Sequence, residues 1–222
     1  MKKKESNLFY DFVYVTGYIP MALWMRPKRI YMGEKPNLKG PILISSNHRG
    51  FIDPAILLSV FPSRRLHCIA SKDLYKNKLL TTFFNHTHCI KIDKTNFSLT
   101  SFHTVIERLD NGCAVVIFPE GQLNTAEEEK GILPFKAGIS LMAYKGGAPI
   151  LPVYIVKREK WYHRQVVVIG DMLDIHEILG EHPSLEQINN ISNILREKEV
   201  ELLNYYESKN KKSSEEREKA AV

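Results

Sequence analysis

The run PILISSNHRGFIDPAILLSVF, residues 41–61, passes from strand-like to helix-like sequence within a few positions. Residues 41–45 are apolar and short, which is typical of a buried strand, whereas residues 54–61 fit a helix. Asp53 before Pro54 predicts a helix N-cap followed by a first-turn proline. The run therefore predicts a strand, a turn and a helix in succession, which is the repeating unit of an α/β fold.

The same alternation continues on both sides of this run. Further short runs rich in Ile and Val predict strands at residues 29–32, 66–70, 88–92, 114–118, 149–156 and 165–170. Helices are expected near residues 73–84, 97–110, 135–146 and 184–206, the last opening with a Ser184 and Gln187 capping box. We therefore expect an α/β domain with a mostly parallel, mixed sheet whose two faces are covered by helices.

Composition places the chain among folded proteins of a reducing compartment. Of its 222 residues 44% are hydrophobic, which is enough to bury a core in one domain. Its three cysteines are scattered and odd in number, so they offer no closed disulfide framework and favour the cytoplasm. The net charge is +6. Most of this positive charge lies in the first 30 residues, where six cations and two acids give 6 − 2 = +4 and flank one apolar segment.

That apolar segment, Leu8–Met25, has four possible roles. A signal peptide needs small residues at its end, and this segment ends in Leu23, Trp24 and Met25. Eighteen helical residues reach only about 27 Å, short of a hydrocarbon core of about 30 Å, so a full crossing is marginal. Aromatic residues and basic flanks favour a helix at the lipid headgroups on the cytoplasmic face of the membrane, peripheral or monotopic; a buried core helix is the alternative.

We accordingly divide the chain into three parts. Residues 1–27 are expected to form a membrane-associating segment, and residues 28–208 the catalytic domain. Residues 209–222 lack an apolar period and are expected to form a flexible charged tail.

Polar residues follow several of the predicted strands. Asn47, Arg49 and Gly50 follow the strand at 41–45, Lys72 that at 66–70, Lys94 that at 88–92, and Glu120 and Gly121 that at 114–118. Parallel strands deliver the loops at their carboxyl ends to one edge of the sheet, where ligands bind. We therefore expect these side chains to share one rim.

His48 and Asp53 are the pair that carries chemistry at this rim. Two side chains that are five positions apart on one helix point in directions about 140° from each other, so they cannot meet there. A turn at Gly50 would let His48 and Asp53 meet. Asp53 would then orient the imidazole and support its protonated form, although Asp53 acting only as a cap beside an ordinary loop histidine stays possible. The chain has no G-x-S-x-G elbow, since Ser140 lacks the last glycine, and Cys113 precedes a buried strand. A histidine base would therefore activate a hydroxyl of the substrate.

Four ordered blocks resemble the glycerolipid acyltransferases, the superfamily of bacterial lysophosphatidic acid acyltransferase. NHRGFID resembles the family motif N-H-x-x-x-x-D, CIKIDK the second block, VVIFPEG the third and GAPILPVYI the fourth. PFKAGISLMA is also similar to the F-K-x-G segment that follows the third block. The resemblance covers residues 42–156.

The resemblance implies acyl transfer from an acyl-carrier-protein or coenzyme A thioester to a lysolipid hydroxyl, without a cofactor or metal. The first candidate acceptor is 1-acyl-glycerol-3-phosphate, which would give phosphatidic acid. His48 and Asp53 would be catalytic. Substrate binding would fall to Asn47, Arg49, Lys72, Lys94, Glu120, Gly121 and Lys136. For Glu120, a loop-ordering role that bonds backbone amides is the alternative.

The chain departs from the family pattern in its third block. Gln122, Leu123 and Asn124 stand where the family commonly has Thr, Arg and Ser, and Lys94 stands where arginine is usual. Lysine keeps the charge but loses the bidentate geometry of arginine. Another lysolipid acceptor, such as a lyso-ornithine lipid or a lysophospholipid, therefore stays open.

Two other classes of function have weaker signals in the sequence. The HTHC run, residues 86–89, offers a single metal-like cluster with too few ligands. A non-enzymatic basic protein that binds anionic membrane by charge alone is the second alternative. No helix-turn-helix, zinc-finger or RNA-binding pattern supports nucleic acid as the partner.

Overall fold

The structure is a computed structural model, which describes residues 7–93, 99–124, 132–136, 138–158, 160 and 162–220, with side chains up to residue 212. Its strands are β1 (Lys28–Tyr31), β2 (Ile42–Ser46), β3 (Leu66–Ser71), β4 (Ile90–Ile92), β5 (Ala114–Ile117), β6 (Ile150–Ile155) and β7 (Val166–Ile169). Its helices are α1 (Leu8–Met25), α2 (Asp53–Val60), α3 (Lys78–His86), α4 (Leu99–Asp110), α5 (Gly138–Lys145), α6 (Ile175–Leu179) and α7 (Leu185–Ala220), with a 3₁₀ turn at Lys72–Leu74. Each run that the sequence predicted as a strand forms one.

The strands form one mixed sheet in the order β1-β7-β6-β2-β5-β3-β4. All neighbouring pairs are parallel except β6 and β7, which are antiparallel. β2 therefore lies between β5 and β6, although both are far from it in the chain. We call the end of the sheet where β2, β5 and β6 finish the carboxyl edge, and the opposite end the amino edge.

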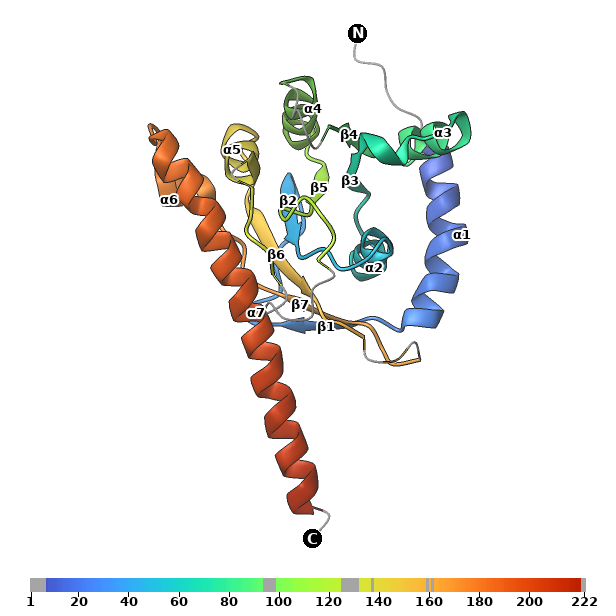
Figure 1. The fold of residues 1–222 in the computed structure, drawn as a ribbon, viewed down its shortest axis with the longest axis vertical. Helices are drawn as coiled ribbons and strands as arrows, with labels where there is room; N and C mark the ends of the chain where they lie inside the picture. The colour runs from blue at the N-terminus through green and yellow to red at the C-terminus, as the bar shows by residue number, and fades with distance from the viewer. Residues whose placement is uncertain are drawn as a thin grey trace.

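Helices cover both faces of the sheet, as the apolar strands predicted (Figure 1). β2 alternates between the two faces: Ile42 and Ile44 join a core with α2 and Met25 of α1, whereas Leu43 joins a core with α4, α5 and α7. All three side chains are essentially inaccessible to solvent. The central strand is thus fixed from both faces, so the loop that leaves it is well anchored.

Helix α1 has two unlike sides. Tyr10 and Met25 are buried, and the Tyr14 hydroxyl donates to the Pro62 carbonyl at 2.9 Å, so one side packs on the domain. The other side exposes large apolar residues at helical spacing. They are Leu8, Phe12, Val15, Ile19 and Leu23, each more than half exposed. In the part of the chain that the structure describes, no helix has the length and apolarity needed to span a bilayer. One side of α1 is therefore part of the protein core. For its exposed apolar side, contact with the lipid headgroups stays a prediction.

Helix α7 begins as the sequence predicted and ends later. Ser184 N–H donates to Gln187 Oε1 at 2.8 Å and Gln187 N–H to Ser184 Oγ at 3.2 Å, which is the predicted capping box. The helix continues to Ala220 and projects beyond the rest of the molecule, so the backbone of residues 209–220 is helical (Figure 1). The flexibility expected for this charged tail stays a prediction. This stretch has no Gly or Pro and is rich in Glu and Lys, which favour helix once a helix is already started.

Candidate active site

The loop between β2 and α2 is folded around the carboxylate of Asp53. Asp53 Oδ2 lies 2.9 Å from His48 Nδ1 and accepts the backbone N–H groups of Arg49 at 2.7 Å and Gly50 at 2.8 Å. The predicted contact of His48 and Asp53 is therefore present. The predicted N-cap is wrong: α2 starts at Asp53 with Ile52 as its N-cap, and the carboxylate bonds amides that precede the helix.

The geometry orients His48 for proton transfer. Its side chain is 20% exposed, whereas that of Asp53 is only 3% exposed. The ring stacks on Phe118 at a centroid distance of 4.1 Å, so packing and the carboxylate fix its plane together. Because Nδ1 faces Asp53, Nε2 is the nitrogen that a substrate can meet, and among the described residues no hydrogen bond occupies it. A histidine held in this way can act as a general base.

Glu120, at the end of β5, holds the same loop from the neighbouring strand. Its Oε1 accepts the backbone N–H of His48 at 2.9 Å, and its Oε2 accepts that of Leu133 at 3.2 Å. The residue is only 4% exposed, and burial raises its pKa above the ordinary value while the backbone N–H bonds partly oppose this. These contacts match the loop-ordering alternative for Glu120.

Gly121 and Lys136 meet beside Glu120. Gly121 has φ +69°, a left-handed conformation that favours glycine, and a Cβ at this position would lie 2.6 Å from Lys136 Cε. The Lys136 backbone N–H donates to the Pro119 carbonyl at 3.0 Å. The structure therefore brings Lys136, as the sequence predicted, to the loop of the third block.

Asn47 and Arg49 flank His48 but differ in surroundings. Asn47 is fully buried; its Nδ2 donates to the Ile155 carbonyl at 3.1 Å and its Oδ1 accepts the Ile155 N–H at 2.7 Å. The carboxamide thus ties the end of β2 to the end of β6. Arg49 is partly exposed, and its guanidinium lies 3.4 Å from the Tyr154 hydroxyl.

The two remaining predicted cations lie farther along the carboxyl edge. Lys72, after β3, pairs with Asp93, after β4, at 2.5 Å, and both are partly exposed. This ion pair raises the pKa of Lys72. Lys94 lies outside the described residues, so its place in the site stays a prediction.

Glu199 of α7 was not among the predicted site residues, although its side chain reaches the end of β2. Ser45 Oγ donates to its Oε1 at 2.7 Å, and the carboxyl group is completely buried. Burial raises its pKa well above the ordinary value, opposed in part by the bonds from Ser45 and the Asn47 backbone. Glu199 lies on the same helix stripe as Leu195 and Leu202, and a charged residue on an apolar stripe is the sequence signal that would have identified it.

The metal alternative gains no support from the HTHC run. His86 Nδ1 lies 2.7 Å from the Thr82 carbonyl, and His88 Nε2 lies 3.1 Å from Asn7 Oδ1. Within the described ranges, no three His, Cys, Asp or Glu side chains are grouped as metal ligands would be.

Comparison with known proteins bears on the family of the chain. Residues 27–156 match the family model described as Acyltransferase. The chain is 30% identical to the 1-acyl-sn-glycerol-3-phosphate acyltransferase of Bacillus subtilis over 56% of this chain and 60% of that protein. It is also 30% identical to the probable 1-acyl-sn-glycerol-3-phosphate acyltransferase of Mycoplasma genitalium over 69% of this chain and 55% of that protein. The chain thus spans less than two thirds of the length of either relative.

A solved structure shares the fold. The 1-acyl-sn-glycerophosphate (LPA) acyltransferase PlsC from Thermotoga maritima superposes with a TM-score of 0.61 at 20% identity. The match covers 88% of this chain and 79% of that chain. At this identity the likeness extends to the mixed sheet and its covering helices.

Proposed function

The chain belongs to the acyltransferase family, and we propose that it transfers a fatty acyl group from a thioester to the free hydroxyl of a lysolipid. The observation that carries the proposal is the 2.9 Å contact between His48 Nδ1 and Asp53 Oδ2, which leaves Nε2 available to a substrate hydroxyl. Two relatives with 30% identity carry the name 1-acyl-sn-glycerol-3-phosphate acyltransferase, which supports the same chemistry.

The proposed reaction needs a base but no covalent intermediate. His48 Nε2 takes the proton of the acceptor hydroxyl as its oxygen attacks the thioester carbonyl. The tetrahedral intermediate then collapses, the C–S bond breaks, and the proton passes from the imidazolium to the departing thiolate. The products are an ester and a free thiol. General-base help of this kind accelerates a reaction by about 10² to 10⁴.

Asp53 and Glu120 have different roles in this proposal. Asp53 fixes the imidazole tautomer and stabilises the imidazolium, because its buried oxygen faces Nδ1. Glu120 acts as a positioning residue, since its two oxygens accept backbone N–H groups of His48 and Leu133. The donor is an acyl-carrier-protein or coenzyme A thioester, which is already activated, so positioning supplies much of the remaining rate.

We assign 1-acyl-glycerol-3-phosphate as the acceptor and phosphatidic acid as the product. Arg49 and Lys136 supply cations near His48 for its phosphate, with Lys72 farther along the same edge. Lysine binds phosphate as a point charge, so the headgroup is read with less geometric selection than an arginine fork would give. Gln122 and Leu123, in place of the usual Thr and Arg, make a different lysolipid headgroup the competing acceptor.

An acceptor panel tests the function. The purified protein is incubated with one acyl thioester and, in turn, lysophosphatidic acid, lysophosphatidylcholine, lysophosphatidylethanolamine and a lyso-ornithine lipid, and product formation is measured by mass spectrometry. We expect the highest kcat/KM with lysophosphatidic acid. A preference for another lysolipid would change the headgroup assignment, whereas no transfer with any donor would remove the enzymatic proposal.

Membrane attachment on the cytoplasmic face is part of the same proposal, because a lysolipid resides in a bilayer. The exposed apolar stripe of α1 is the candidate anchor. Deleting residues 1–27 would also remove Met25 from the core, so substitution is the cleaner test. Phe12→Ser, Val15→Ser and Ile19→Ser together should shift the protein to the soluble fraction while its circular dichroism stays unchanged. An unchanged membrane fraction would place the anchor elsewhere.

A further inference from the structure

The connection between β6 and β7 is fastened to the end of α1. Arg26 Nη2 donates to the Tyr162 carbonyl at 2.8 Å, and Arg164 Nε donates to the Arg26 carbonyl at 3.0 Å. Gln165 N–H donates to the Met25 carbonyl at 2.9 Å. These bonds join segments more than 130 positions apart in the chain into one unit.

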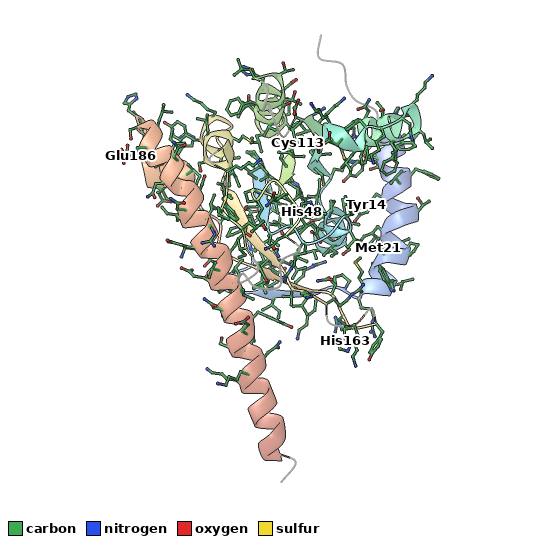
Figure 2. All side chains as sticks on the ribbon, in the orientation of Figure 1. Tyr14, Met21, His48, Cys113, His163 and Glu186 are labelled. Carbon is green, nitrogen blue, oxygen red and sulfur yellow. The ribbon has the colours of Figure 1, made fainter. Side chains whose placement is uncertain are left out.

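This unit pairs cations with exposed aromatic rings. The Arg158 guanidinium lies 4.6 Å from the ring centroid of Trp24, and Lys160 Nζ lies 5.7 Å from that of Tyr162. Trp24 is 41% exposed and Tyr162 is 49% exposed. We call Trp24, Arg26, Arg158, Lys160 and Tyr162 the basic corner. Figure 2 shows His163, which follows Tyr162, beside the lower end of α1.

The sequence of the connection is strongly cationic. Residues 157–164, KREKWYHR, hold four Lys or Arg and one Glu, which gives 4 − 1 = +3, and Arg26 adds a fifth cation. Such a density of charge with interleaved aromatic residues is characteristic of protein surfaces at anionic lipid headgroups.

The basic corner lies at the same edge of the sheet as His48. β6 ends at Ile155 and the parallel strand β2 ends at Ser46, so the segments that follow them leave the sheet on the same side. The loop of His48 also exposes an apolar side chain there, Phe51, which is 80% exposed. The exposed stripe of α1 ends at this edge too, with Leu23 at 73% exposure.

We propose that the basic corner is a second contact with an anionic lipid bilayer, distinct from the apolar stripe of α1. Two contacts define an orientation, whereas a single helix lying on the surface leaves the domain free to rotate about it. The corner turns the carboxyl edge, and with it His48, toward the lipid, so a lysolipid reaches the base without leaving the membrane. This consequence rests on the proposed function; the binding does not, and it is measured without acyl transfer.

Vesicle binding provides the first test. The double variant Lys160→Glu with Tyr162→Ser keeps the Tyr162 carbonyl that accepts from Arg26, so the connection stays fastened. One surface cation contributes about a fivefold change in binding to anionic lipid, so this variant should bind phosphatidylserine-containing vesicles about tenfold or more weakly. Added salt should reduce the difference in vesicle binding between the variant and the unchanged protein, because salt screens the attraction between lysine and anionic lipid.

The matched control lies at the amino edge. Lys145→Glu with Leu185→Ser makes the same charge change, and Leu185 is 72% exposed at the start of α7. It should bind vesicles like the unchanged protein. Equal losses in both double variants would mean that net charge alone governs binding and would overturn the proposal. Weaker binding of an acidic acyl carrier protein with unchanged vesicle binding would also overturn it.

Fluorescence tests the orientation directly. The chain has two tryptophans, Trp24 and Trp161. Trp24→Phe with Trp161→Phe permits one new tryptophan, placed either at Tyr162 or, as the control, at Leu185. Brominated phosphatidylserine vesicles should quench the tryptophan at 162 strongly and that at 185 weakly. Equal quenching, or none at position 162 in vesicle-bound protein, would contradict the proposed contact.

Discussion

The two edges of the sheet use histidine in opposite ways. At the carboxyl edge, His48 faces the buried carboxylate of Asp53 and remains partly exposed. At the amino edge, the rings of His67 and His88 stack at 5.2 Å, Tyr10 stacks on His88 at 5.4 Å, and both histidines are at most 6% exposed. A histidine serves as a base where a partner orients it and a substrate can reach it, and burial keeps a substrate from His67 and His88, so of these three histidines His48 has the arrangement of a base.

The cations at the two edges also differ in their surroundings. At the amino edge, Arg64 donates to the carbonyl groups of Leu38, Gly40 and Gly112, so its charge fastens loops. At the carboxyl edge, Lys136 is exposed beside Gly121, where a ligand can meet it. Figure 2 labels His48, which follows β2, and Cys113, which precedes β5, so the two residues mark the two edges.

His48→Ala should have the largest effect. Removing the proposed base should lower kcat for acyl transfer by about 10³ or more while the circular dichroism and Tm stay close to those of the unchanged protein. The matched control is His67→Phe, which keeps an aromatic ring in the amino-edge stack and should retain activity within a few-fold. Near-normal turnover by His48→Ala would refute the mechanism.

Asp53→Asn should have the next largest effect. The amide oxygen can still accept the N–H groups of Arg49 and Gly50, so the turn should persist. The charge that supports the imidazolium is lost, so kcat should fall by about 10² or more. The kinetic parameters separate the roles: loss of the charge should lower kcat while KM and Tm stay nearly unchanged, whereas a purely structural Asp53 would lower Tm or raise KM.

Glu120→Gln should have a smaller effect on activity and a measurable one on stability. One carboxylate oxygen becomes an NH₂ group that faces a backbone N–H donor, either that of His48 or that of Leu133. Losing this acceptor should lower the free energy of unfolding by about 1–3 kcal/mol and reduce kcat about tenfold by displacing His48. Urea unfolding and steady-state kinetics measure the two quantities. Unchanged values for both would show that Glu120 does not position the loop.

Glu199→Gln should have the smallest effect of the four substitutions. It should change how the free energy of unfolding depends on pH. Burial raises the pKa of Glu199 in the folded state, so between its unfolded value near 4.5 and the raised value the folded protein binds more protons than the unfolded chain. The free energy of unfolding contributed by this group therefore falls as pH rises through that window.

Glutamine cannot titrate, so the variant should lose the pH-dependent contribution of Glu199 to the free energy of unfolding. At pH 8 the variant should be as stable as the unchanged protein or about 1 kcal/mol more stable. Urea unfolding at pH 5.5 and pH 8 measures it. A variant with the same pH dependence as the unchanged protein would mean that Glu199 does not titrate in this range. Glu120→Gln serves as the comparison, because the same substitution there removes the acceptor of one backbone N–H group, that of His48 or that of Leu133.

Local sequence was sufficient for most of the elements and for the contact between His48 and Asp53. Strand runs such as residues 114–118 and the stripe of α7 repeat at the period of their secondary structure, so they could be identified without the fold. His48 and Asp53 lie five positions apart, and their contact needs only the turn between them. The end of α7 was misjudged because an apolar period indicates where a helix packs, not where its backbone stops being helical.

Asp53 shows that local sequence does not always predict where a side chain points, even within a short segment. Asp before Pro is a common start of a helix, yet here the carboxylate bonds the N–H groups of Arg49 and Gly50. Local preference left the direction of the side chain open, because the same carboxylate can accept from amides on either side of it.

What the sequence determined by itself is the strands, most of the helices, the α/β class, and the turn in which His48 meets Asp53. Tertiary structure alone decided which distant groups surround that turn. The order β6-β2-β5 brings Ile155 to Asn47 and Glu120 to His48, and α7 brings Glu199 to Ser45, 154 positions away. Local periodicity specifies which face of an element is buried but not which element it pairs with, because pairing depends on contacts among residues far apart in the chain.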